Sequence, residues 1–255
     1  MVSLTDHPAL LFVVTAVLLW MASRGGALFR NALSLPADDV DEEQFTLILA
    51  ATLTLLGLII GFTFSMAMNR YDQRKTYEEE EANAIGTEYL RLDVLPDVDA
   101  TKGRILMREY LNQRIVFYTN RNAEILRESQ IKTFQLQSDL WALVTPWATS
   151  RPSGISAILL SGMNDVFNSE GYTEAIWRNR VPTAAWILLI AIAVFSTFLV
   201  GFHSKRKRSR LLILLPIAVS LSFFLIAEID SPRSGIVRIH AQNLESLADS
   251  LSAAK

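Results

Sequence analysis

Residues 61–87 read GFTFSMAMNRYDQRKTYEEEEANAIGT, a stretch that begins with apolar side chains and ends in dense charge. It contains no proline, and no glycine lies between Gly61 and Gly86. Proline and glycine are the residues that most often interrupt a helix. The stretch therefore predicts one helix that leaves a membrane and continues into water without a hinge. A simple anchor has no need of this continuity, whereas a pore or a stalk that transmits force does.

The rest of the chain also separates its charged residues from its apolar ones. Hydrophobic residues make up 51% of the 255 residues, and four windows hold almost no charge: 8–21, 45–68, 182–202 and 211–229. A helix needs about 20 apolar residues to cross a hydrocarbon core of about 30 Å. The last three windows have this length, and the first reaches it if residues 22–29 contribute. We expect four spans in a multi-pass protein of the inner or plasma membrane, with the lipid bilayer as its surroundings.

Between the second and third windows the chain is polar and has helical periodicity. The first helix of this region closes at Pro96, the next covers 101–119, a third covers 124–143 before Pro146, and a fourth follows in 153–168. The predicted fold is all-α, a four-span helical membrane protein with an extramembrane helical bundle inserted between spans two and three. The domains we expect are 1–68 (spans one and two), 69–181 (a bundle continuous with span two), 182–229 (spans three and four) and 230–255 (a C-terminal tail).

The side of the membrane on which the bundle lies follows from basic residues, which favour cytoplasmic loops. The densest basic segment, HSKRKRSR at 203–210, lies in the short linker between spans three and four. It favours cytoplasmic linkers and an extracytoplasmic bundle. Span two by itself argues for the reverse orientation, because acids precede it and NRYDQRK follows it.

One face of the second span carries small and polar residues at spacings of three and four. These residues are Thr54, Gly57, Gly61, Ser65 and Asn69. Such a stripe can line a water-filled pore, and it also matches the small-residue pattern that lets helices pack closely in lipid. In a symmetric ring, neighbouring residues of one stripe can serve both purposes.

Basic residues follow this face directly. Arg70, Arg74 and Lys75 are candidates for the charge of a pore vestibule. Intrahelical pairing of Lys75 with Glu78 and Glu79 is the alternative, and the two arginines can also clamp subunits together.

Motifs for other classes of function are missing from the sequence. There is no cysteine, and the three histidines lie far apart, so the sequence offers no metal-ligand cluster. No phosphate-binding loop, dinucleotide turn or nucleophile motif is present. A net charge of −2 argues against a nucleic-acid-binding surface. We expect no enzyme, no cofactor, no metal and no nucleic-acid partner.

Two acids, Glu228 and Asp230, lie at the end of the fourth window, close to hydrocarbon. They can meet Arg233 at the membrane interface, or they can mark an ion path.

Several segments resemble one family. NRYDQRK at 69–75, EEANAIGTEYLRLDVLP at 80–96, REYLNQRI at 108–115 and IDSPRSGIVRI at 229–239 are similar to the bestrophin-like domain family of bacteria and plants. The resemblance implies likeness to bestrophins, pentameric ion channels with four spans per subunit and a neck-lining span that continues into a cytosolic helical region. It would place Tyr71, Arg74 and Lys75 just below a neck lined by Ile60, Phe64 and nearby positions. No counterpart of the bestrophin calcium-binding acidic cluster is present.

We therefore expect a homo-oligomeric, bestrophin-like ion channel, pentameric by the resemblance, with span two lining the pore. Arginine-rich walls favour anions and the acids of the linker 30–44 favour cations, so the sequence leaves the permeant ion open. The alternative is a non-enzymatic membrane sensor or scaffold whose helical bundle binds a ligand or partner protein. Subunit number separates the two, because a closed ring favours a pore.

Overall fold

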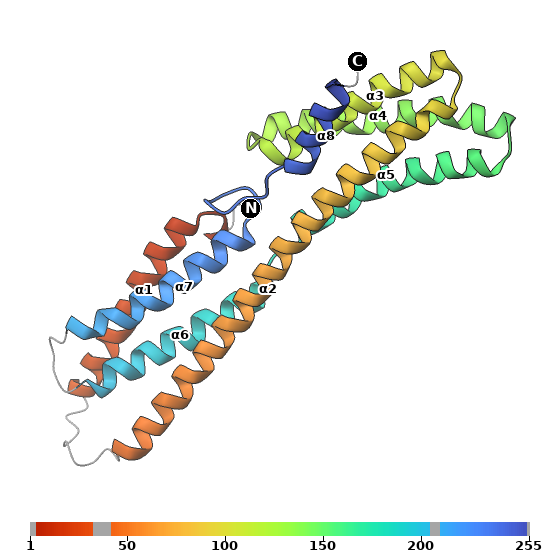
Figure 1. Ribbon diagram of the computed structural model, residues 1–255. Coiled ribbons are helices and arrows are strands. Elements are labelled where there is room, and N and C mark those ends of the chain that lie inside the picture. Colours follow the sequence, from red (N-terminus) through yellow and green to blue (C-terminus); the bar gives the residue numbers. More distant parts are fainter. Residues whose placement is uncertain (1–3, 33–41, 205–209, 254–255) are drawn as a thin grey trace. The chain divides into compact units, whose positions relative to one another are not determined.

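The computed structural model describes residues 4–32, 42–204 and 210–253. Within these ranges the chain is helical almost throughout and contains no strand (Figure 1), which confirms the all-α prediction. The long helices are α1 (Pro8–Ala32), α2 (Glu42–Arg91), α3 (Asp97–Thr119), α4 (Ala123–Ser150), α5 (Gly154–Arg178), α6 (Thr183–His203), α7 (Leu214–Asp230) and α8 (Gln242–Ala253). Three short 3-10 helices accompany them: η1 (Leu4–Asp6), η2 (Leu92–Val94) and η3 (Arg210–Ile213).

The chain forms two compact units. Unit one consists of Met1–Tyr71 and Arg180–Arg238, and unit two of Asp72–Asn179 and Ile239–Lys255. The 50-residue helix α2 contributes its first part to unit one and its last part to unit two. The C-terminal region is likewise divided, because its first residues belong to unit one and α8 belongs to unit two.

Three helical stretches of the described chain are long and apolar enough to cross a membrane. They are Pro8–Ala32, Glu42–Val94 and Gly154–His203. The fourth expected span corresponds to η3 and α7, and α7 has 17 residues, the lower limit for a crossing of about 30 Å. The structure therefore supports a membrane protein with three candidate spans and does not confirm the four-span layout.

Helices α1 and α6 of unit one pack closely, and two glycines permit this approach. A Cβ atom built on Gly201 would lie 1.8 Å from the carbonyl oxygen of Ser23, and one on Gly26 would lie 2.1 Å from that of Phe198. Such contacts are far shorter than van der Waals distances, so only glycine fits at either position. Close helix packing through small residues is thus found between α1 and α6.

The apolar part of α2 remains largely uncovered. Only 6% of its most apolar segment is buried within the described chain, against 28% for α1. Over the whole part of α2 that belongs to unit one, the buried residues are Leu56, Thr63 and Ala67. A helix this apolar must cover its surface with lipid or with other chains.

Unit two is built from α3, α4, α5, α8 and the charged end of α2. Side-chain caps start two of its helices: the Asn122 side chain accepts from Glu124 N at 2.8 Å, and Ser153 Oγ accepts from Ser156 N at 3.2 Å. The prediction that a helix ends before Pro146 is wrong, because α4 continues through Pro146 to Ser150. Proline in a helix removes one backbone hydrogen bond, yet the helix continues past Pro146, and Ala148 beyond it is buried.

Candidate functional site

The small-residue face of α2 has no packing partner within the described chain. Thr54, Gly57, Gly61, Ser65 and Asn69 are all exposed. A Cβ atom built on Gly57 or Gly61 would meet nothing within 4 Å. Packing of this face inside the described chain is therefore ruled out, and lipid, another chain or water remains to cover it.

Ile60 and Phe64 lie on the more buried border of this face. Both are half-buried and pack against the apolar core of unit one, beside Leu56 and Ala67. The positions that the resemblance implies as pore lining therefore adjoin the small-residue face and are less exposed than it is.

The three basic residues that follow, Arg70, Arg74 and Lys75, also differ in burial. Arg74 is 0% exposed, and it donates from Nη2 to the carbonyl of Asn179 at 3.1 Å and from Nε to that of Ile176 at 3.4 Å. These carbonyls lie at the C-terminus of α5, where helix carbonyls lack intrahelical partners and carry partial negative charge. In place of the expected vestibule charge, Arg74 has a structural role. Arg70 is half-buried and Lys75 is exposed.

Glu78, which we expected to pair with Lys75, instead caps α8. Its Oε1 accepts the backbone N–H groups of Asn243 at 2.9 Å and Leu244 at 3.0 Å, and its Oε2 accepts from Asn243 Nδ2 at 2.6 Å. A carboxylate at a helix N-terminus satisfies otherwise unpaired donors and complements the helix dipole. Glu78 thereby fixes α8 to the charged end of α2.

The two acids at the end of α7 accept hydrogen bonds from the backbone of unit one. Asp230 Oδ1 accepts from Val181 N at 3.0 Å, and Glu228 Oε2 accepts from Ile236 N at 2.6 Å. Gly235 has φ of 111°, and a Cβ atom there would lie 2.2 Å from Glu228 Oε2. These acids thus tie the turn after α7 and the start of α6 in place.

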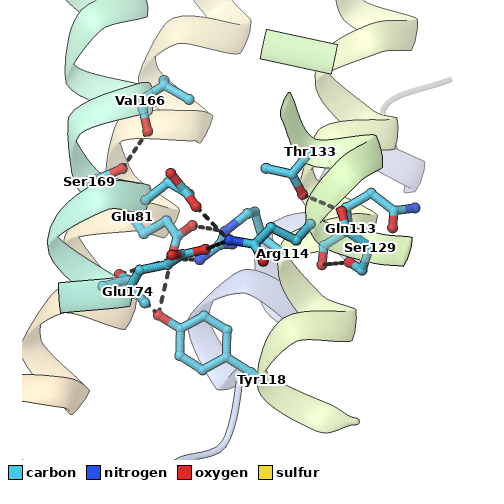
Figure 2. Close-up of polar contacts among 12 residues, drawn as sticks. Glu81, Gln113, Arg114, Tyr118, Ser129, Thr133, Val166, Ser169 and Glu174 are labelled. Carbon is cyan, nitrogen blue, oxygen red and sulfur yellow. Dashed lines mark hydrogen bonds and ion pairs between the residues drawn. The ribbon is translucent and has the colours of Figure 1, made fainter. Parts of the chain in front are cut away.

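A buried charge cluster lies inside unit two, with Arg114 at its centre (Figure 2). Arg114 Nε donates to Glu81 Oε1, and Nη2 lies 3.5 Å from Glu81 Oε2. The second carboxylate oxygen also accepts from Tyr118 OH at 3.0 Å and from Thr173 Oγ1 at 3.2 Å. Glu170 Oε1 lies 3.7 Å from Arg114 Nη1. The cluster joins α2, α3 and α5 at one point.

Burial sets the protonation of this cluster. Desolvation raises the pKa of Glu170 to about 7, although the Arg114 charge acts in the opposite direction. Burial also raises the pKa of the Tyr118 phenol, so it remains a neutral donor. Burial lowers the pKa of Arg114, but the Glu81 carboxylate more than reverses this effect. Arg114 therefore keeps its charge, and Glu170 exchanges a proton near neutral pH.

A second buried carboxyl, Glu88, lies further along α2. Its Oε2 accepts from Arg91 Nη1 at 3.3 Å, while Oε1 is buried and has no hydrogen-bond partner among the described residues. Burial raises the pKa of Glu88 to about 7. The pair occupies space that Gly162 leaves, because a Cβ atom there would lie 1.9 Å from Glu88 Oε2.

Comparison with known proteins identifies the family. A sequence model described as the Bestrophin-like domain matches residues 9–244, nearly the whole chain. The chain belongs to the bestrophin-like family. This membership confirms the resemblance carried by the segments around NRYDQRK and IDSPRSGIVRI.

Solved structures share the fold of this bestrophin-like chain. A crystal structure of a bacterial bestrophin homolog from Klebsiella pneumoniae, phased with zinc, matches with a TM-score of 0.65 and 13% identity over 95% of this chain and 96% of that one. A single-substitution variant of a bestrophin homolog from the same organism gives a TM-score of 0.63, also at 13% identity, with the same coverage. A structure described as a membrane protein variant gives 0.66 at 13% identity over 94% and 97% of the two chains. No curated protein matches the sequence.

Sequence reasoning missed the buried charges of the bestrophin-like chain, although a signal for them is present. The buried positions of α2 in unit two recur at spacings of four and three, as expected of the inner face of a helix. They are Arg74, Glu78, Glu81, Ala82, Ile85, Glu88 and Tyr89. Four of the seven are charged, so a search for apolar periodicity passes over them.

Proposed function

We propose that this chain assembles into a homo-oligomeric ion channel in which α2 lines the pore. One observation carries the proposal: the face of Gly57 and Gly61 has no neighbour in the described chain, on a helix that runs on into unit two. Family membership supports it, because bestrophins are ion channels. Five subunits follow from the resemblance.

The chemistry of the face explains why a ring of chains suits it. Thr54 satisfies its hydroxyl on Ala50 O at 2.8 Å, but the Asn69 amide and the bare backbone at the glycines gain little from lipid. Small residues allow close approach of another helix, and small polar residues admit water. A closed ring of identical chains provides both surroundings.

We also propose four crossings, by α1, the apolar part of α2, α6, and α7 with η3. The extramembrane bundle then corresponds to 69–181 between 1–68 and 182–229, with 230–255 as the tail. The basic segment at 203–210 favours an extracytoplasmic bundle, and bestrophin likeness favours a cytosolic one; residues 205–209 lie outside the described residues. The chain has no cysteine, so Thr101→Cys and Ala32→Cys, both at exposed positions, report the two sides by labelling with an impermeant thiol reagent.

Arg70 and Lys75 are the charges we propose for the vestibule, since Arg74 is buried. They favour anions. Of the linker acids that favour cations, Glu42 and Glu43 are described and exposed, in the first turn of α2; those at 38, 39 and 41 lie outside the described residues. The sign of the reversal potential decides between the two ions.

The experiment is conductance of purified protein in planar bilayers under asymmetric salt, with subunit number measured in the same preparation. We expect a closed ring with discrete, selective openings. Gly61→Leu should block conduction or assembly, whereas Gly25→Leu is the matched control, because Gly25 of α1 is equally uncrowded. A non-conducting monomer or dimer would contradict the channel, and a fully conducting, fully assembled Gly61→Leu would remove this face from the pore and from the interface.

A second candidate, a sensor or scaffold, is favoured by one observation. Helices α4 and α5 of unit two expose several large apolar side chains, among them Ile131, Phe134, Ile155 and Ile158. Exposed apolar side chains in a soluble bundle are suited to binding a partner. Subunit number again separates this candidate from the channel.

A further inference from the structure

Unit one contains an open cavity of about 470 Å³ where helices α1 and α6 begin. Its walls combine two kinds of residue. Asp6 and Arg180 provide charge, and the apolar wall includes Leu11, Trp186, Ile187 and Ile190.

The charged part of the cavity is an ion pair between Arg180 and Asp6. Arg180 Nη2 lies 2.6 Å from Asp6 Oδ1, and the two side chains are 31% and 29% exposed. A guanidinium has five N–H donors and a carboxylate has about four acceptor positions, so each group can bind a further partner. Among the described residues that line the cavity, the charged side chains are thus one positive and one negative group, side by side at its rim.

The apolar wall runs away from this rim along α6. From Thr183 to Ile190 the helix rises by about 10 Å, and α6 contains no Asp, Glu, Lys or Arg along its whole length. Ile187 is exposed and Ile190 half-buried, and Trp186 packs inward against Phe223, with ring centroids 6.2 Å apart. Because α6 is part of a candidate span, this wall extends to the depth of hydrocarbon.

We propose that this cavity binds one phospholipid whose zwitterionic headgroup carries a primary ammonium, as in phosphatidylethanolamine. The phosphate binds Arg180, the ammonium binds Asp6, and one acyl chain lies along Ile187 and Ile190. Two features select this lipid. The paired rim charges match a headgroup with one charge of each sign, whereas an anionic lipid would bring a charge with no counterpart at Asp6. A primary ammonium donates hydrogen bonds to Asp6, whereas quaternary ammonium has no N–H and favours open aromatic faces, and Trp186 is 7% exposed.

The inference depends on the membrane location of α1 and α6 and does not depend on conduction or on subunit number. It also assigns a role to η1, since this short helix carries the carboxylate that completes the rim.

Native mass spectrometry of the full chain, after reconstitution with phosphatidylethanolamine, phosphatidylcholine or phosphatidylglycerol, tests the proposal. We expect one retained phosphatidylethanolamine per chain, with at least a tenfold preference over the other two. Asp6→Asn should reduce the preference over phosphatidylcholine towards one, and Arg180→Gln should weaken retention of both phospholipids. The matched control is Arg178→Gln, whose exposed pairing with Glu174 lies in unit two.

Lipid-dependent thermal stability gives an independent measurement, because a ligand that binds only the folded state raises its Tm. Phosphatidylethanolamine should raise the Tm of the wild-type chain more than phosphatidylcholine does, and Arg180→Gln should abolish the difference. Equal retention of all three lipids by the wild-type chain, or a preference for phosphatidylglycerol, would overturn the proposal. So would undiminished phosphatidylethanolamine retention by both variants. If either variant fails to fold, the comparison of lipids on the wild-type chain decides alone.

Discussion

Arg114 and Glu81, 33 positions apart in the sequence, form an ion pair in the interior of unit two, with side chains 2% and 0% exposed. Tyr118 and Thr173 donate to the same carboxylate. The pair thus joins α2 to α3 and α5 through charge-assisted hydrogen bonds, which are stronger than neutral ones.

Arg114→Met should destabilise unit two strongly. Removing one partner of a buried pair leaves the other charge without compensation, which costs about 3–5 kcal/mol. Thermal unfolding in detergent, followed by circular dichroism, measures the loss. Lys132→Met is the control, because the Lys132–Glu109 pair is exposed and such pairs contribute about 0–1 kcal/mol.

Combining Arg114→Met with Glu81→Gln should recover part of the stability, because no full charge then remains unpaired at that position. A double variant less stable than Arg114→Met alone would contradict this account of the cluster.

The stability of unit two should fall as pH rises from about 4.5 to about 7. Burial raises the pKa of Glu88 from 4.5 to about 7, so within this window the folded state holds a proton that the unfolded state has lost. The contribution to stability is therefore most favourable below 4.5 and is lost above about 7. The denaturant midpoint should change less steeply with pH across this range in Glu88→Gln than in the wild-type chain. Glu80→Gln, at an exposed position, should keep the wild-type dependence of the midpoint on pH.

Glu170 has a pKa raised in the same direction, also to about 7. The double variant Glu88→Gln, Glu170→Gln should therefore lose most of the pH dependence. An unchanged slope in the double variant would show that neither carboxyl holds its proton in the folded state.

Glu78→Ala should loosen α8. Loss of a helix N-cap costs about 0.5–2 kcal/mol, and here Asn243 and Leu244 both lose their acceptor. Hydrogen exchange of residues 242–253 should become faster while α3 keeps its protection. Glu79→Ala removes an equal charge at an exposed neighbouring position and should leave α8 protected; equal acceleration in both variants would point to net charge and not to capping.

Two glycine substitutions should have opposite effects on the isolated protomer. Gly201→Ala forces the α1 and α6 backbones apart, and overpacking of this kind costs about 1–3 kcal/mol. Gly57→Ala meets nothing within 4 Å and gains helix propensity worth about 0.5–1 kcal/mol. Denaturation of detergent-solubilised protomer measures both. A destabilised Gly57→Ala protomer would mean that this face packs within one chain after all.

The local features of the fold could be read from the sequence because they depend on neighbours along the chain. Apolar length predicted helices for membrane crossing, and the unbroken stretch from Gly61 to Gly86 predicted the continuous helix α2. The helix end predicted before Pro146 was wrong, because whether a helix continues past a proline also depends on packing, and Ala148 on the following turn is buried.

The candidate site could be read only in part. Spacing placed Gly57 and Gly61 on one face, and adjacency grouped Arg70, Arg74 and Lys75. Burial then separated Arg74 from the others, and burial depends on α5, which is a hundred positions away in the sequence.

The sequence by itself determined that this protein is helical, that it enters a membrane and that it belongs to the bestrophin-like family, because hydropathy, periodicity and local motifs are properties of contiguous residues. Only the tertiary structure decided which glycines are crowded and which charges are buried. Gly201 and Gly57 are the same residue in apolar helices, yet a Cβ atom on Gly201 would overlap the backbone of α1, whereas one on Gly57 would meet no described atom within 4 Å. Glu81 and Glu80 are adjacent, yet one is buried against Arg114 and the other is exposed. The physical reason is that crowding and desolvation depend on segments distant in the chain.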